Sequence, residues 1–132
     1  FKTFSYLVHW QARKGAEAAG FDEAILLNED GHLASGAMTN LFWAKAGRLF
    51  TPAHEAGCRK GAVRRWIAAR QPLEEGRFPA AVLDDADEVF LANSWIGIRP
   101  VTRIGERPLP AAPGPVTEAL ALRYRTEVAA SA

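Results

Sequence analysis

The chain has 132 residues, of which 48% are hydrophobic and 23% are charged, with 16 basic and 15 acidic side chains. This length suits one domain with a core of its own, and the balanced charge argues against a nucleic-acid-binding or membrane-surface protein, which normally carries a basic excess. No apolar run approaches the roughly 18 residues of a membrane span, and the single cysteine, Cys58, excludes an internal disulfide and favours a reducing, cytoplasmic compartment.

The first half of the chain predicts one helix followed by short strands. Tyr6, Trp10 and Arg13 recur at helical spacing, which predicts a helix over residues 5–19. Apolar runs bounded by turn residues then predict strands over residues 23–28, 32–35, 40–45 and 48–51. This pattern indicates a meander of short strands rather than a βαβ array.

The second half of the chain mixes helices, strands and a proline-rich segment. In order, we expect a helix over 62–69, a polar connection over 71–79, a helical turn over 81–86, strands over 88–92 and 98–103, a stiff linker over 108–115 and a last helix over 116–128. The sequence therefore predicts a single α+β domain over residues 1–132, with a mainly antiparallel sheet and about three helices.

Several familiar catalytic motifs do not occur. The spacing of His9, His32 and His54 matches no zinc motif, so a metal site is not expected. The sequence contains no nucleophile elbow and no Walker A motif. We interpret the acidic residues between positions 84 and 88 as a solvated helix end.

Two turns have residues suited to an anion. Gly61 precedes a predicted helix, whose first N–H groups and positive dipole end attract anions, and a glycine lets the backbone approach a phosphate closely. Asn93 and Ser94 end an apolar strand and add donors. Each turn alone is more typical of an ordinary chain reversal, whereas together they would form a phosphate cup. Lys2 stands alone near the terminus, where lysine is normally solvated.

Six motifs follow one another along the chain: Lys2-Thr3-x-x-Tyr6, Gly20-x-Asp22-Glu23-Ala24, Asn28-x-x-Gly31, Thr39-Asn40-Leu41-Phe42-Trp43, Thr51-Pro52 and Gly61-Ala62-Val63-Arg64. In this order they resemble the class IV (fold-type IV) aminotransferase family, whose enzymes use pyridoxal 5′-phosphate (PLP). The string over residues 86–101 is most similar to the 4-amino-4-deoxychorismate lyase branch. The resemblance implies the C-terminal domain of the D-amino-acid aminotransferase-like fold, which has a barrel-like core.

The resemblance also implies a cofactor site. Lys2 matches the catalytic lysine, which binds PLP covalently and then shuttles protons at the substrate carbons. Gly61, Ala62 and Val63 match the helix start whose backbone N–H groups hold the cofactor phosphate. Ser94 matches the second phosphate-binding position.

Ser35 departs from the family pattern. The matching position usually carries a glutamate that keeps the pyridine nitrogen of the cofactor protonated, which makes the ring a strong electron sink. A serine can donate a hydrogen bond to that nitrogen but cannot hold a proton on it. We therefore expect weaker transamination, whereas lyase chemistry that forms an aromatic ring should suffer less.

The resemblance thus implies an enzyme that converts a small-molecule substrate, 4-amino-4-deoxychorismate, to 4-aminobenzoate and pyruvate for folate biosynthesis. The alternatives are a branched-chain or D-amino-acid aminotransferase of the same fold, or a degenerate, non-catalytic homologue marked by Ser35. Family members are longer and form homodimers. Since the chain begins at Phe1 rather than Met, we expect a C-terminal domain without the N-terminal domain or the strand before Lys2, and little turnover by that fragment alone. Neither a nucleic acid nor a membrane is an expected partner.

Overall fold

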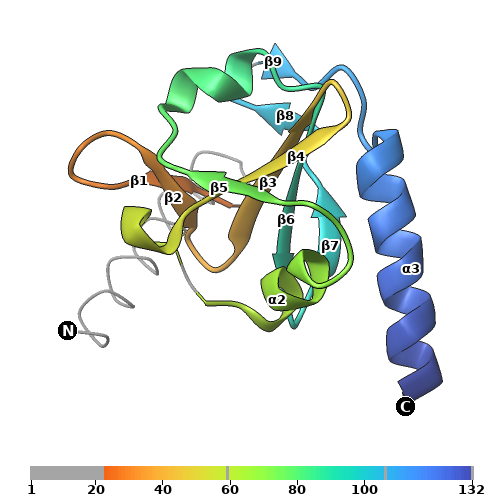
Figure 1. The fold of residues 1–132 in the computed structure, drawn as a ribbon. Helices are drawn as coiled ribbons and strands as arrows, with labels where there is room; N and C mark the ends of the chain where they lie inside the picture. The colour runs from red at the N-terminus through yellow and green to blue at the C-terminus, as the bar shows by residue number, and fades with distance from the viewer. Residues whose placement is uncertain (1–22, 59, 106, 132) are drawn as a thin grey trace.

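The computed structural model describes residues 23–58, 60–105 and 107–131 (Figure 1). Lys2 and the helix predicted over residues 5–19 lie outside these residues. Within the described part of the chain, no helix is both long and apolar enough to cross a membrane.

A five-stranded sheet, in the order β5-β4-β3-β6-β7, forms the centre of the fold (Figure 1). β3 (Asn40–Lys45) lies in the middle and pairs antiparallel with β4 (Arg48–Pro52) on one side and β6 (Glu88–Asn93) on the other. β7 (Gly97–Pro100) pairs antiparallel with β6, and β5 (Glu74–Gly76) runs parallel to β4.

The turn between β3 and β4 follows from its two central residues. Ala46 and Gly47 have φ angles of 53° and 79°. A two-residue hairpin turn of type I′ requires positive φ at both positions, and its twist matches the twist of the flanking strands. The register that results pairs Trp43 with Phe50, whose rings stack at 5.9 Å.

Smaller elements surround the sheet. β1 (Ile25–Leu27) and β2 (Leu33–Gly36) form one antiparallel pair, and β8 (Arg103–Ile104) and β9 (Arg107–Pro108) form another. The long helix α3 (Pro115–Ser131) packs along β7 and β6. The other helical elements among the described residues are the 3₁₀ helices η1 (His54–Ala56) and η2 (Ala80–Asp84) and the short helix α2 (Ala62–Ala68).

The sheet separates two apolar clusters, because neighbouring residues of a strand point to opposite faces. Phe42 and Phe90 stack with their ring centroids 4.8 Å apart on the face covered by α2 and α3. Trp43, Leu91 and Leu33 belong to the cluster on the other face. Adjacent residues of one strand therefore serve two cores.

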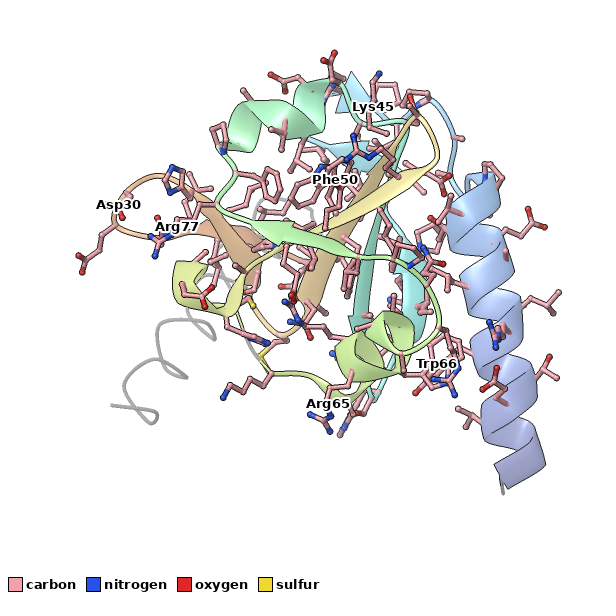
Figure 2. The ribbon with its side chains drawn as sticks, viewed as in Figure 1. Asp30, Lys45, Phe50, Arg65, Trp66 and Arg77 are labelled. Carbon is pink, nitrogen blue, oxygen red and sulfur yellow. The ribbon has the colours of Figure 1, made fainter. Side chains whose placement is uncertain are left out.

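Trp66 joins the two helices on their shared side of the sheet. Its ring meets Tyr124 of α3 edge-on, with centroids 5.2 Å apart, and the guanidinium of Arg70 lies 4.3 Å from the indole centroid. The preceding residue, Arg65, is exposed (Figure 2). One face of this short helix thus packs on the molecule while the other meets solvent.

Glu88 is buried, which corrects the prediction of a solvated acidic cluster for this one member, whereas Asp84, Asp85 and Asp87 are exposed. It is 3% exposed and accepts hydrogen bonds from the N–H groups of Val116 and Thr117, at 3.0 and 2.8 Å, and from the Thr117 hydroxyl at 2.7 Å. These N–H groups belong to the first turn of α3, where a helix has no internal acceptor for them. The carboxylate therefore fastens the start of α3 to β6.

The α+β fold with a mainly antiparallel sheet is confirmed, but three connections differ from the prediction. The polar segment predicted over 71–79 contains β5, so that β4 and β5 form a parallel pair joined through α2 rather than part of a simple meander. The segment after β7 forms the β8–β9 ladder. The proline-rich segment packs closely: Leu109 is buried, and a Cβ at Gly114 would lie 2.4 Å from the carboxylate carbon of Glu88.

Candidate functional site

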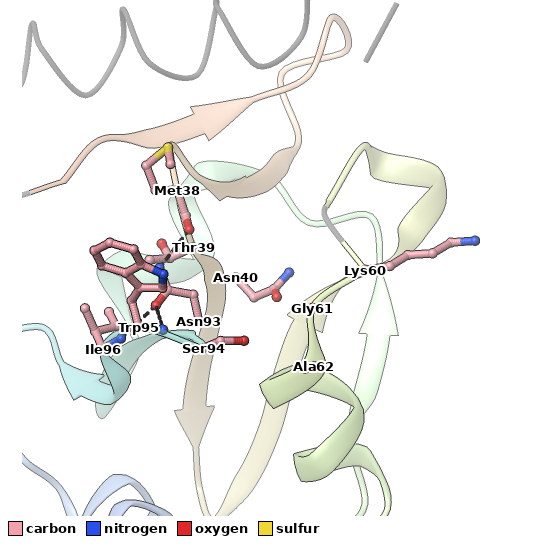
Figure 3. A pocket seen from close by; sticks show the side chains of 10 residues that line it. All are labelled: Met38, Thr39, Asn40, Lys60, Gly61, Ala62, Asn93, Ser94, Trp95 and Ile96. Carbon is pink, nitrogen blue, oxygen red and sulfur yellow. Dashed lines mark hydrogen bonds between the residues drawn. The ribbon is translucent and has the colours of Figure 1, made fainter. Parts of the chain in front are cut away.

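Three segments that are distant in the sequence meet around a pocket of ≈ 680 Å³ (Figure 3). The β2–β3 turn contributes Met38, Thr39 and Asn40, the start of α2 contributes residues 60–62, and the β6–β7 turn contributes residues 93–96. This volume is typical of small-molecule sites. All three segments are connections or element ends at one end of the central sheet (Figure 3).

The start of α2 presents backbone donors to the pocket. The first N–H groups of an α-helix have no intrahelical acceptor, and the N-cap residue, Gly61, has no side chain with which to cap them. Gly61 is also required by packing, since a Cβ there would lie 2.2 Å from Oδ1 of Asn40. Gly61 and the Asn40 side chain therefore lie in close contact at the edge of the pocket.

Arg64 anchors this helix to the sheet. Its side chain is 3% exposed and donates through Nη1 to the Thr51 hydroxyl at 3.0 Å and to the Pro52 carbonyl at 2.8 Å, while Nη2 pairs with Glu75 of β5. The Thr51 hydroxyl in turn donates to the Leu41 carbonyl at 2.7 Å. A buried guanidinium needs such partners, and this set fixes α2 against β4 and β5.

The pocket has a polar end and an apolar end. Lys60, Asn40 and Ser94 lie near the start of α2, whereas Met38 and Trp95 lie together on the other side (Figure 3). Trp95 is 95% exposed. Among the described residues that line the pocket there is no carboxylate, so no negative charge of the lining repels an anion, while the Lys60 side chain points away from Asn40 and Ser94 (Figure 3).

Cys58 lies in the loop that leads to α2. Its thiol is close to the Pro52 carbonyl, at 3.4 Å, and to Nδ1 of His54, at 3.6 Å. Burial raises the pKa of the Cys58 thiol, and the nearby Arg64 guanidinium offsets part of that rise. Burial of the thiol therefore favours its neutral form. The described residues contain no group of His, Cys, Asp and Glu side chains suited to a metal ion.

The structure brings together some of the residues that the sequence proposes for the site. Gly61, Ala62 and Ser94 line the same pocket, although they come from two distant segments. The side chain of Val63 is buried in the core, so only its backbone is available for binding. Lys2 lies outside the described residues.

Ser35 is not among the residues that line the pocket. It is 0% exposed, and its hydroxyl has no hydrogen-bond partner among the described residues. Burying a hydroxyl without a partner costs free energy, so this atom is a candidate for contact with a bound group.

Sequence reasoning missed Met38, Thr39 and Asn40, which form one wall of the pocket. A signal was present, because the polar residues Thr39 and Asn40 stand at the start of an apolar run, Thr39 directly before β3 and Asn40 as its first residue, and the structure buries both. Buried polar residues at a strand end need partners, and here Glu23 accepts hydrogen bonds from the Met38 N–H and the Thr39 hydroxyl, at 3.0 and 3.2 Å.

Comparison with known proteins gives a consistent result. The sequence model of the family described as Amino-transferase class IV matches residues 1–104. The aminodeoxychorismate lyase of Bacillus subtilis (strain 168) is 33% identical over an alignment that covers 96% of this chain and 45% of that protein.

Two solved structures are similar in both sequence and fold. The branched-chain aminotransferase of the thermophilic archaeon Thermoproteus uzoniensis, with norvaline, is 34% identical with a TM-score of 0.88, over 93% of this chain and 42% of that one. The branched-chain amino acid aminotransferase of Thermobaculum terrenum in its PLP-form is 28% identical with a TM-score of 0.87, over 93% and 42%. The chain thus spans less than half the length of these relatives.

Proposed function

The chain belongs to the class IV aminotransferase family, and on that basis we propose that it provides the cofactor-phosphate site of a PLP-dependent enzyme. The observation that carries the proposal is the convergence of Gly61, Ala62 and Ser94 on one pocket that has no carboxylate in its described lining. The N–H groups at the start of α2 and a hydroxyl suit a phosphate dianion.

In this proposal, each residue has a separate task. The N–H groups of Ala62 and Val63 and the Ser94 hydroxyl bind the phosphate. Lys2 holds the cofactor covalently and moves a proton to and from the substrate carbon. When bound, PLP supplies an electron sink for negative charge that develops at that carbon.

In this proposal, Ser35 determines how strongly the cofactor ring withdraws electrons. Its buried hydroxyl, without a partner among the described residues, can donate one hydrogen bond to the pyridine nitrogen but cannot hold a proton there. We expect Ser35→Glu to raise transamination at least about tenfold, because a carboxylate beside the nitrogen strengthens the electron sink. Steady-state assays with an amino acid and 2-oxoglutarate measure this change. Ser35→Ala is the control for loss of the hydroxyl alone, and an unchanged rate in Ser35→Glu would rule out this role.

The reaction that we propose is the conversion of 4-amino-4-deoxychorismate to 4-aminobenzoate and pyruvate. The similarity to the B. subtilis lyase over nearly the whole chain and the Asn93-Ser94 pair support it. The apolar end of the pocket, with the exposed indole of Trp95, also suits a flat ring. Branched-chain transamination is the second candidate, supported by the similarity to the T. uzoniensis enzyme.

Two measurements test the proposal on the purified full chain. The first is absorbance after addition of PLP: we expect a band from lysine-bound cofactor that disappears on borohydride reduction and does not form in Lys2→Ala. The second compares pyruvate release from 4-amino-4-deoxychorismate with 2-oxoglutarate-dependent transamination. No band would contradict the cofactor site, and transamination without pyruvate release would favour the second candidate.

We also propose that the enzyme acts as a homodimer. Fold-type IV sites draw residues from more than one domain or subunit, according to the resemblance, and exposed apolar side chains such as Trp95 favour association. Light scattering on the full chain measures this, and a monomer at micromolar concentration would contradict it.

A further inference from the structure

We propose that Asn93 is a positioning residue, which holds the β6–β7 turn against the β2–β3 turn and so determines where Ser94 stands in the pocket. The inference rests on the proposed phosphate site. Asn93 itself lines the pocket, and the positioning role follows from its hydrogen bonds within this chain.

Asn93 uses both ends of its amide. Its Oδ1 accepts from the N–H groups of Trp95 and Ile96, at 2.9 and 2.8 Å, and its Nδ2 donates to the Met38 carbonyl at 3.0 Å (Figure 3). The opposite orientation of the amide would place a donor against two donors and an acceptor against an acceptor, so this arrangement alone satisfies all three contacts. One side chain thus shapes its own turn and ties it to another segment.

The partner turn is fixed from its far side. Glu23 accepts from the Met38 N–H at 3.0 Å and from the Thr39 hydroxyl at 3.2 Å through Oε2, and from the Ala24 N–H at 3.0 Å through Oε1. Met38 is therefore held through both its N–H and its carbonyl. The Asn93 amide is therefore bonded to a residue, Met38, that the Glu23 carboxylate holds in place.

The hydrogen bond between Asn93 and Met38 lies at the end of the β6–β7 ladder. The last paired positions of β6 and β7 are Asn93 and Gly97, and residues 94–96 project beyond them. Ladder hydrogen bonds therefore do not fix the Ser94 hydroxyl. Because the Trp95 and Ile96 N–H groups are already bonded to Asn93, the turn offers a ligand Ser94 rather than those two amides.

Asn28 supplies a matched control elsewhere in the molecule. Its Oδ1 accepts from the N–H groups of Asp30 and His32, at 2.9 and 3.0 Å, and its Nδ2 donates to the Ala56 carbonyl at 3.2 Å. This is the same set of three bonds in the β1–β2 turn, and Asn28 does not line the pocket. A serine at either position keeps an oxygen that can cap the turn but is too short to reach the distant carbonyl.

The experiment compares wild type, Asn93→Ser and Asn28→Ser in the full chain. Each is titrated with PLP and with pyridoxal, which lacks the phosphate, and melted to record Tm. We expect Asn93→Ser to weaken PLP binding at least about tenfold while pyridoxal binding changes less than about threefold. Asn28→Ser should lower Tm by a similar amount and leave the ratio of the two affinities as in wild type.

Two results would overturn the inference: an unchanged affinity ratio in Asn93→Ser, or an equal loss of the ratio in Asn28→Ser. If wild type itself does not bind PLP, the proposed function fails, and the inference fails with it. Should Asn93→Ser not fold, Glu23→Gln tests the same connection from the side of the β2–β3 turn, because Glu23 holds Met38 in place. We expect this variant to lose a smaller part of the ratio of PLP to pyridoxal affinity. An unchanged ratio would contradict the inference.

Discussion

Gly61 shows how one residue can be required by space rather than by backbone angle. Its φ of −93° suits any residue, yet a Cβ would lie 2.2 Å from Oδ1 of Asn40. We expect Gly61→Ala to lose about 1–3 kcal/mol of stability and to weaken PLP binding, because either the start of α2 or the buried Asn40 side chain must move. Gly31→Ala is the contrasting control, since φ there is +80° but nothing lies within 4 Å of a Cβ. That variant should lose stability without losing PLP affinity, and equal PLP affinities in both variants would contradict the prediction.

The partly buried thiol of Cys58 is expected to react at a rate that depends on pH. Because burial raises the pKa of its thiol, less thiolate is present at neutral pH than in the unfolded chain. We expect iodoacetamide to alkylate the folded protein more slowly than the urea-unfolded protein, with the difference closing as the pH passes the folded pKa. The stabilising effect of the neutral thiol is present below the unfolded pKa and is lost as pH rises through the folded one. Equal rates in both states at neutral pH would contradict this.

Residue types explain which parts of the site the sequence could predict. Gly61, Ala62 and Ser94 stand in turns with a local anion-binding signature, and the structure places them around one pocket, although their binding role stays a prediction. Asn40 and Met38 carry no such signature. Their place in the pocket depends on the pairing of β3 with β6, which is a long-range contact that no local pattern specifies.

Among the elements, α3 is fastened at its start by a single side chain. Glu88 accepts three hydrogen bonds from Val116 and Thr117 at the first turn of α3. We expect Glu88→Ala to cost about 2–4 kcal/mol, because it removes a buried charge-assisted cap and leaves these donors unpaired. Urea unfolding measures the loss. Glu118→Ala, an exposed acidic residue in the same turn, is the control, and a loss below that of Glu118→Ala would exclude the capping role.

The sequence predicts the buried strands β3 and β6 correctly but does not predict the polar strand β5. β3 and β6 read as apolar runs, and the structure has them at almost the predicted bounds. β5 contains Glu74 and Glu75 and becomes a strand because it pairs with β4, while Glu75 binds Arg64 of α2. Tertiary pairing, rather than β-propensity, produces such edge strands.

For the whole molecule, stability rests on the two-sided sheet. Phe90 is fully buried and stacks on Phe42. We expect Phe90→Ala to lose about 3–5 kcal/mol, a large part of the stability of a domain this size. Trp95→Ala removes an aromatic ring that is 95% exposed and should change stability by less than about 0.5 kcal/mol. Equal losses in the two variants, measured by urea unfolding, would contradict this description of the core.

The pairing of β3 with β6 also has a consequence for synthesis on the ribosome. β4 follows β3 at once and can form a hairpin, but β6 is made only after α2, β5 and η2. During the intervening seconds of translation, one edge of β3 has no partner, and its apolar side chains have no second strand to shield them. Nascent chains in which residues 88–93 have not yet left the ribosome should therefore be the species that chaperones bind and that aggregates most readily, and emergence of these residues should end that vulnerability.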